Sequence, residues 1–407
     1  MFDVEQIRKD FPILSLPING RPVAFLDTSA SAQKPLCVLE KMRQVYLTSY
    51  ANAHRGSYYF AEVLTGEFEA ARQTVQQFVN ARSSKEIVFT RNATESINLV
   101  AATWGAQNLH AGDEVLISEA EHHANLVPWQ HICEVTGAVL RVFKIADNGD
   151  FIKEEFLHAL NEHTKLVAVT AMSNVLGTVF PIKEIASAAH QAGAKVLVDA
   201  CQFAVHHKID VQDIDCDFLA FSGHKTYGPT GIGVLYGKAE ILQNMPPYQF
   251  GGDMIERVTF EKTTYADIPA RFEAGTSASV QAIGMAEGLK YMQNLGLDNI
   301  MQHEKELTAY TTARLNKVPN LKIVGTAANK GGVFSFAVNH IHPQDLAFVL
   351  NKENVAIRTG HHCAEPLVNR MGYTSLARAS LGLYSNKNDI DRLVEALLKA
   401  EKFFREN

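Results

Sequence analysis

A lysine that directly follows a predicted buried strand is the first candidate for chemistry. The segment FSGHKTYGPTGIG places Lys225 in a glycine-rich turn crowded with hydrogen-bonding side chains. Burying an amine is costly unless it reacts, and a lysine held beside a carbonyl cofactor forms a Schiff base. A solvated loop lysine is the more common reading of such a turn. The turn therefore indicates a catalytic lysine only if another residue supports it.

A carboxylate at the end of a second apolar strand gives that support. Asp199 ends the apolar run in VLVDACQ. An aspartate in this place can pair with the pyridinium nitrogen of pyridoxal 5'-phosphate (PLP), which keeps the ring protonated as an electron sink. An ordinary loop carboxylate is the alternative. Asp199 and Lys225, each ending its own strand, are far more specific together than either is alone.

Two further polar turns follow predicted strands. Around Thr94, the segment IVFTRNATESINLV reads as a strand, a turn and a helix whose N-terminal amides suit a phosphate, although a plain helix cap fits equally well. In SEAEHHANLVPW, His122 and His123 could stack on a pyridine ring and shuttle protons. A metal site competes with this reading, but adjacent histidines in one short loop rarely bind the same ion.

The segment RTGHHCAEP, residues 358–366 and hereafter the cysteine loop, has the composition of a reactive thiol site. Cys363 follows Arg358, His361 and His362, three potentially cationic neighbours that favour the thiolate. Downstream, Arg378 is a lone basic residue in an apolar, strand-like run. It suits a clamp on a substrate carboxylate, and a buried structural ion pair is an equal alternative.

The elements that must position these residues alternate between strands and helices. Short runs rich in Val, Ile and Phe predict strands at Glu86–Thr90, Glu114–Ser118, Lys165–Ala171, Lys195–Asp199, Asp217–Ser222 and Ile232–Tyr236. This alternation predicts an α/β fold with a mostly parallel sheet that is covered on both faces. Ligands of such sheets bind at the carboxyl ends of the strands, where the candidate residues stand.

The pattern changes after Thr276. Before it, residues 254–264 favour an extended hairpin; after it, a helix is predicted from Val280 to about Leu295, followed by strands near 332–339 and 355–358. A final helix carries one apolar stripe and has Asn386 or Asn388 as its cap; the stripe is Ile390, Leu393, Val394, Leu397, Leu398 and Phe404. We therefore expect a large domain over 16–276 and a smaller α+β domain made of 1–15 and 277–407.

Composition excludes several classes of protein. With 407 residues, the chain exceeds the roughly 250–300 residues at which single cores usually split. The net charge of −6 and the lack of long charge runs do not favour nucleic acid as a partner. No apolar stretch approaches the ~18 residues of a membrane span, and no signal-peptide pattern begins the chain, so a cytoplasmic protein is expected.

Four cysteines are expected to be small buried residues without disulfides: Cys37, Cys133, Cys201 and Cys216.

Taken together, the motifs EHHANLVPW, VLVDACQ, FSGHKTYGPTGIG, RFEAGT and RTGHHCAEP resemble the cysteine desulfurases of aminotransferase class V. The resemblance runs from LDTSASAQKP to the final helix, and the short cysteine loop points to group II, the SufS/CsdA-like enzymes. It implies the PLP-dependent transferase fold type I, with a mostly parallel, seven-stranded-type sheet in the large domain and a smaller C-terminal α+β domain that carries the cysteine loop. It also implies that PLP is the cofactor and that L-cysteine becomes L-alanine while the sulfur is held as a persulfide on Cys363.

By motif position, the resemblance assigns three catalytic residues: Lys225 as the Schiff-base lysine, His122 as the ring-stacking acid/base, and Cys363 as the sulfur acceptor. Asn174 and Arg378 would hold the substrate carboxylate. The cofactor-binding residues that it implies are Ala93, Thr94, His122, Asp199, Gln202, Ser222, His224, Lys225 and Thr276.

Within this set, Asp199 would pair with the pyridine nitrogen and Gln202 would contact the phenolic oxygen. Thr276 of RFEAGT would reach the phosphate from the other subunit, which implies a homodimer with composite sites. The resemblance also implies a SufE- or SufU-like protein that takes the sulfur for iron–sulfur cluster assembly.

The chain departs from the family pattern at a few positions. The family commonly has DGAQ where this chain has DACQ. Ala200 and Cys201 are therefore small residues in place of other small residues. Asn92 stands where the family has a turn glycine, and Ala93 stands where it has a hydroxyl on the phosphate side, but Thr94 remains. Glu365, two residues after Cys363, is also unusual and could alter how a sulfur acceptor docks.

Two rivals come from other classes. A selenocysteine lyase, or another class V lyase or aminotransferase, would keep Lys225 and Asp199 but tolerate the loss of Cys363. A non-catalytic PLP-binding scaffold would be expected to have lost Lys225 or Arg378, and both are present.

Overall fold

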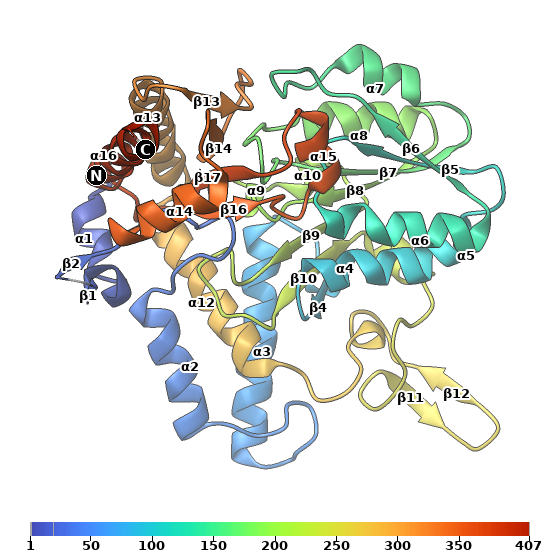
Figure 1. Ribbon diagram of the computed structural model, residues 1–407. Coiled ribbons are helices and arrows are strands. Elements are labelled where there is room, and N and C mark those ends of the chain that lie inside the picture. Colours follow the sequence, from blue (N-terminus) through green and yellow to red (C-terminus); the bar gives the residue numbers. More distant parts are fainter. Residues whose placement is uncertain (1, 19, 407) are drawn as a thin grey trace.

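A mostly parallel sheet forms the centre of the chain in the computed structural model, which describes residues 2–18 and 20–406 (Figure 1). Within those residues, the seven strands of this sheet lie in the order β4-β10-β9-β8-β7-β5-β6. Their bounds are β4 (Ile87–Thr90), β10 (Gly233–Gly237), β9 (Phe218–Ser222), β8 (Lys195–Asp199), β7 (Thr164–Thr170), β5 (Glu114–Ser118) and β6 (Val139–Phe143). The strands from β9 to β6 are parallel, and β10 is antiparallel to both of its neighbours. The predicted α/β fold is confirmed.

The edge strand β6 was missed by the sequence prediction. Val139 and Val142 are 47% and 49% exposed in it, and Arg141 interrupts the apolar run to pair with Glu114 at 2.9 Å. An edge strand is covered less completely than a central one, so it shows no continuous apolar signal.

Helices cover both faces of the sheet, as predicted. Alternate residues of each strand enter different cores: Val196 and Val198 of β8 face one core, while Leu197 faces the other. The first core contains residues of α3 (Tyr59–Phe78), α8 (Ile182–Gln191) and α12 (Ser279–Leu295). The second contains residues of α4 (Ala93–Val100) and α6 (Val127–Thr136).

A smaller four-stranded sheet lies in the C-terminal part of the described residues, in the order β13-β14-β17-β16. Its strands are β13 (Leu321–Val324), β14 (Val333–Val338), β17 (Leu376–Ser380) and β16 (Arg358–Gly360). Its core is shared with α13 (Leu297–Leu315), α14 (Pro343–Lys352) and α16 (Lys387–Glu406). The remaining helix here, α15 (Glu365–Arg370), follows the cysteine loop.

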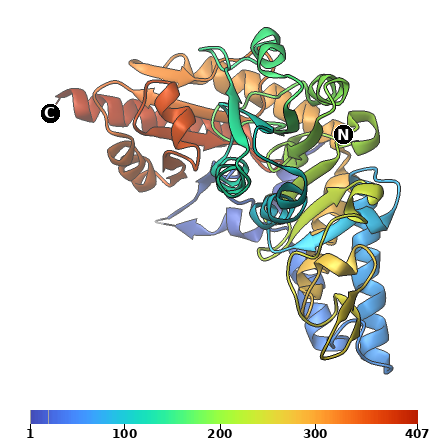
Figure 2. The same cartoon turned by 90° about the vertical axis from the view of Figure 1, so that its right-hand side faces the viewer.

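The other elements are short or peripheral. The helices are α1 (Val4–Arg8), α2 (Leu36–Thr48), α5 (Ala106–Asn108), α7 (Lys153–Ala159), α9 (Phe203–His206), α10 (Val211–Ile214) and α11 (Ala239–Leu242). The strands are β1 (Pro17–Ile18), β2 (Arg21–Pro22), β3 (Ala24–Phe25), β11 (Ile255–Val258), β12 (Thr263–Tyr265) and β15 (Val355–Ala356). The β11–β12 pair confirms the predicted hairpin, and it extends from the same end of the molecule as α2 and α3 (Figure 2).

Two details of the C-terminal predictions were tested. Asn386 caps α16, because its Oδ1 accepts from the N–H of Asp389 at 2.9 Å. Leu398 was wrongly placed in the apolar stripe, since it is 41% exposed.

The division into a domain over 16–276 and a domain made of 1–15 and 277–407 stays a prediction. Residues 1, 19 and 407 lie outside the described part. No helix in the described part is long and apolar enough to cross a membrane.

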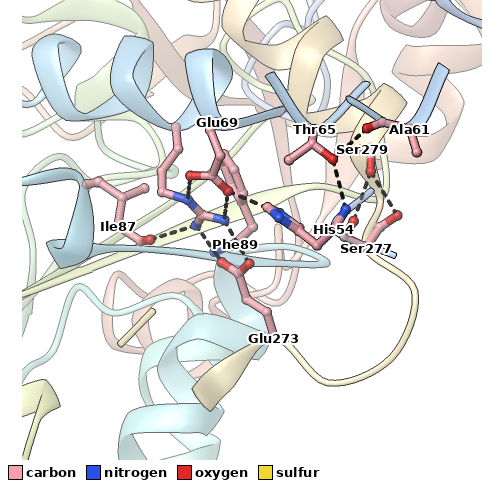
Figure 3. A network of polar contacts seen from close by, with 10 residues as sticks. His54, Ala61, Thr65, Glu69, Ile87, Phe89, Glu273, Ser277 and Ser279 are labelled. Carbon is pink, nitrogen blue, oxygen red and sulfur yellow. Dashed lines mark hydrogen bonds and ion pairs between the residues drawn. The ribbon is translucent and has the colours of Figure 1, made fainter. Parts of the chain in front are cut away.

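A buried ion pair covers the open edge of β4. Arg72 of α3 donates from Nη1 to the Ile87 carbonyl at 2.9 Å, and Glu273 Oε1 accepts from the Phe89 N–H at 2.7 Å (Figure 3). The two side chains also bind each other, at 2.6 Å between Arg72 Nη1 and Glu273 Oε1 and 2.9 Å between Arg72 Nη2 and Glu273 Oε2. They take the place of a neighbouring strand, and they anchor the segment that carries Thr276.

Candidate active site

A cavity of about 210 Å³ lies at the carboxyl ends of β7, β8 and β9, where Thr170, Asp199 and Ser222 line it. The N-terminus of α4 contributes to its wall, and the cysteine loop and β17 reach it from the C-terminal part. The predicted site residues that line it are Ala93, Thr94, His122, Asn174, Asp199, Gln202, Ser222, His224, Lys225, Cys363 and Arg378. Side chains that are far apart in the sequence are thus brought together at one place.

Thr276 is the predicted site residue that the structure does not place there. It is exposed and lines a different cavity of about 260 Å³, together with Phe89, Arg91 and Glu273. A residue that serves another subunit must lie outside the cavity of its own chain. Its expected role therefore stays a prediction.

Asp199 and Lys225 occupy neighbouring parts of this cavity. Asp199 is 4% exposed, and its Oδ1 accepts from the backbone N–H of Cys201 at 2.9 Å. Lys225 lies in the turn after β9, and its backbone N–H donates to the Ser222 carbonyl at 3.3 Å. Burial and the nearby Asp199 carboxylate raise the pKa of the Cys201 thiol well above its usual range, so this cavity residue is a neutral thiol.

His122 is neutral at physiological pH. Burial, followed by the positive charge of Lys225, lowers its pKa to about 4. Its Nδ1 accepts from the Ala124 N–H at 3.0 Å, so the ring proton is on Nε2. The fixed tautomer gives the cavity one imidazole N–H that can be donated and regained.

Hydrogen-bond donors gather at the α4 end of the cavity. The Ala93 N–H lies 2.9 Å from Ser222 Oγ, and His224 Nδ1 lies 3.2 Å from Ser31 Oγ. Burial lowers the pKa of His224 to about 4. Asn92, where the family has a glycine, has a φ of −174° and caps α4 by accepting from the Glu95 N–H at 2.9 Å. This backbone is extended, so the missing glycine causes no strain.

The cysteine loop is held from both sides of the cavity. The Cys363 carbonyl accepts from the His123 N–H at 2.7 Å, and the His362 carbonyl accepts from Asn174 Nδ2 at 2.7 Å. His362 itself is 4% exposed, and burial, followed by the charge of Arg378, lowers its pKa to about 3. The expectation that His362 is a cationic neighbour of Cys363 is therefore wrong, because a buried imidazole beside a guanidinium stays neutral.

Arg378 is almost fully buried at the cavity wall. Its Nη1 donates to the Asn174 carbonyl at 2.9 Å, and its Nη2 lies 3.3 Å from Asp27 Oδ1. Burial raises the pKa of Asp27 although Arg378 opposes this shift. Within the described residues, Arg378 Nε has no hydrogen-bond partner. Arg378 thus has a carboxylate partner in Asp27 and one buried N–H without a partner, and its role as a clamp on a substrate carboxylate stays a prediction.

The sequence reasoning missed Ser29 and Ala30, which line the cavity from the N-terminal segment. The Ser29 carbonyl accepts from Gln202 Nε2 at 2.9 Å, which orients the Gln202 amide. Gln202 Oε1 is buried and, among the described atoms, has no partner. The signal lay in LDTSASAQKP, but no periodicity or strand end distinguishes Ser29 within it.

The cavity matches the chemistry of PLP. It offers an amine in Lys225, a buried carboxylate in Asp199, a helix N-terminus with hydroxyls for a phosphate, and unsatisfied polar atoms on Gln202 and Arg378. The competing metal reading of the histidine pair finds no support, because the described residues contain no group of three or more His, Cys, Asp or Glu that could hold a metal ion.

The sheet, the cavity at its carboxyl edge and the lysine–carboxylate pair define an α/β enzyme of the PLP-dependent transferase type. The chain belongs to the aminotransferase class-V family, whose sequence model matches residues 24–393. A cysteine desulfurase of Cronobacter sakazakii is 48% identical over 402 residues, which cover 98% of this chain and 99% of that protein. A cysteine desulfurase of Synechococcus elongatus is 46% identical over 98% of this chain, but the match covers 64% of the relative's length.

A solved structure is similar over nearly the whole chain. It is the cysteine desulfurase CsdA from Escherichia coli, in an S-sulfonic acid form, with 36% identity and a TM-score of 0.92 over 99% of both chains. The predicted type of fold and the resemblance to SufS/CsdA-like enzymes are confirmed.

Proposed function

We propose that this chain is a PLP-dependent cysteine desulfurase that converts L-cysteine to L-alanine and holds the sulfur as a persulfide on Cys363. One observation carries the proposal: Lys225, Asp199 and Cys363 line the same cavity although they come from separate parts of the sequence. A lysine–carboxylate pair suits PLP chemistry at an amino acid, and a thiol in the same cavity can take sulfur from it.

Specific residues would hold the cofactor. Asp199 would pair with the ring nitrogen, Gln202 would contact the phenolic oxygen, and His122 would stack on the ring. The phosphate-binding residues are Ala93, Thr94, Ser222 and His224. Lys225 would be the residue to which the cofactor attaches. Bound PLP supplies an electron sink for the electron pair left when the Cα proton of the substrate is removed.

The chain's own groups bind the substrate and move protons. Arg378 and Asn174, which line the cavity, bind the carboxylate of L-cysteine. Lys225 Nζ accepts the Cα proton of the substrate. His122 Nε2, which carries the ring proton, is the atom that exchanges protons with the substrate thiol.

Sulfur transfer takes place on Cys363. Its thiolate attacks the sulfur of the substrate, so an S–S bond forms while the Cβ–S bond breaks and its electron pair stays on the substrate carbon. Protonation of that carbon and return of the Cα proton give alanine, and the persulfide remains on Cys363. A SufE- or SufU-like acceptor then takes the sulfur for iron–sulfur cluster assembly in the cytoplasm.

The active form is a homodimer in this proposal. Thr276 is exposed and lies outside its own chain's cavity, so it is free to reach the phosphate of a second subunit. The two sites are then composite, and each needs the segment anchored by Arg72 and Glu273 of the other chain.

The first experiment measures alanine formed from L-cysteine with a reductant and a sulfur acceptor present. The parent protein should form alanine, and Cys363→Ala should not, although it should keep the violet absorbance of bound PLP. Lys225→Ala should lose both alanine formation and the violet absorbance. Equal activity of parent and Cys363→Ala, or no activity in either, would refute the proposal. Turnover of L-selenocysteine by Cys363→Ala without turnover of L-cysteine by the parent would instead favour a selenocysteine lyase.

A further inference from the structure

The second histidine of the pair, His123, has no part in the proposed reaction, yet it binds the cysteine loop twice. Its backbone N–H donates to the carbonyl oxygen of Cys363 at 2.7 Å. Its Nε2 accepts from the backbone N–H of Glu365 at 3.0 Å. A single residue that follows β5 therefore holds the chain immediately before and after Ala364.

The backbone at this point needs support. His362 and Cys363 have φ angles of 53° and 55°, in the left-handed region that residues with a Cβ rarely adopt. Asn174 binds the carbonyl of His362, and His123 binds that of Cys363. Each of the two left-handed residues is thus held by a donor from outside the loop.

The imidazole of His123 also completes the start of α15. Ala364 is the N-cap residue of this helix and has no side-chain oxygen to accept a first-turn N–H. His123 Nε2 accepts the Glu365 N–H in its place. Because Nε2 is the acceptor, the ring is neutral with its proton on Nδ1. His122 has the opposite tautomer, so the two adjacent histidines are built for different tasks.

We propose that His123 is a positioning residue for sulfur transfer: by capping α15 through Nε2, it fixes the loop so that Cys363 Sγ faces the substrate. The inference rests on the proposed function, in which Cys363 attacks the sulfur of the substrate. Orientation of a nucleophile affects the chemical step more than substrate binding, so the effect belongs in kcat.

Three variants isolate the acceptor atom. His123→Leu removes it, His123→Gln offers an Oε1 acceptor, and His131→Leu is a matched control at an exposed histidine of α6. The backbone bond to Cys363 remains in all of them. We expect kcat for alanine formation to fall about three- to tenfold in His123→Leu, with KM within about twofold of the parent, as the loss of one hydrogen bond predicts. His123→Gln should recover most of the loss, and His131→Leu should match the parent.

A second readout does not depend on turnover. Mass spectrometry follows the alkylation of Cys363 by iodoacetamide in the PLP-bound protein without substrate. A loosened loop should raise this rate at least about twofold in His123→Leu but not in His123→Gln. The proposal is overturned if His123→Leu keeps both the kcat and the alkylation rate of the parent, if His123→Gln is as impaired as His123→Leu, or if the loss lies wholly in KM. If the parent forms no alanine, the proposed function fails, and the alkylation rates still decide whether His123 holds the loop.

Discussion

The guanidinium of Arg378 donates to the backbone carbonyl of Asn174 at 2.9 Å, across 204 residues of sequence. Asn174 in turn donates from Nδ2 to the carbonyl of His362 at 2.7 Å. The two residues proposed to bind the substrate carboxylate are thus bonded to each other and to the cysteine loop. Substrate binding and the placement of Cys363 share one set of contacts.

Replacing Arg378 should therefore impair both binding and chemistry. In Arg378→Met, the substrate loses its carboxylate partner and Asn174 loses its anchor, so kcat/KM should fall by about 10²- to 10³-fold, with both constants affected. Steady-state alanine formation measures this effect. The control is Arg405→Met on the exposed side of α16, which should behave as the parent. A change in KM alone would show that the link through Asn174 has no effect on the chemical step.

The five cysteines should differ sharply in reactivity. Burial raises the pKa of Cys37 and Cys133 to about 11, and it raises those of Cys201 and Cys216 further. At neutral pH these four thiols are protonated and react slowly. Mass spectrometry after brief exposure to iodoacetamide should find Cys363 modified first, and Cys363→Ala should take up little label. Early labelling of Cys201 would contradict its proposed state as a buried neutral thiol.

Stability should fall as the pH drops below neutrality. His362 has a folded-state pKa of about 3, against 6.5 for the free side chain. Between these values the unfolded chain binds more protons than the folded one, so the free energy of unfolding decreases as the pH falls. At pH 5 this one group accounts for about 2 kcal/mol.

Urea unfolding at pH 7.5 and pH 5 measures this dependence. His362→Gln keeps an N–H donor toward the Leu376 carbonyl, which lies 3.0 Å from the Nε2 of His362, but it cannot titrate. Its loss of stability between the two pH values should be smaller than that of the parent. Equal losses would mean that His362 does not stay neutral in the fold.

The Arg72–Glu273 pair should contribute to stability mainly through its burial. The side chain of Arg72 is 4% exposed and that of Glu273 is 12% exposed. Arg72 also pairs with Glu69 at 3.0 Å, so it is the removal of Arg72 that leaves the buried Glu273 charge without compensation. Arg72→Met should lower the free energy of unfolding by about 3–5 kcal/mol. The double variant Arg72→Met/Glu273→Met should lose less than the sum of the single changes, because the two residues are in contact.

An exposed pair provides the matched control for this cycle. Lys183 and Asp213 are 67% and 60% exposed, and Lys183→Met should change stability by less than about 1 kcal/mol. Urea unfolding of all four variants gives the comparison. Additive losses in the Arg72 and Glu273 cycle would rule out coupling between them.

Local sequence signals determined the central sheet and the residues that end its strands. Apolar runs bounded by polar turns are local features, so β8 with Asp199 and β9 with the following Lys225 could be predicted without a structure. The predicted hairpin at 254–264 and the cap at Asn386 depend on neighbouring residues in the same way. Strand β6 was not predicted, because an edge position weakens the apolar pattern that a buried strand shows.

Only the tertiary structure decided how the C-terminal residues meet the sheet. Arg378 and the cysteine loop reach the cavity through contacts with Asn174 and His123, which lie about two hundred residues or more earlier in the chain. Charge states depend on the same contacts. His362 reads as a possible cation in the sequence, but it is neutral in the fold because burial beside Arg378 disfavours a second positive charge. Spacing along a chain shows which residues are available for chemistry, whereas burial and long-range contacts decide what each of them can do.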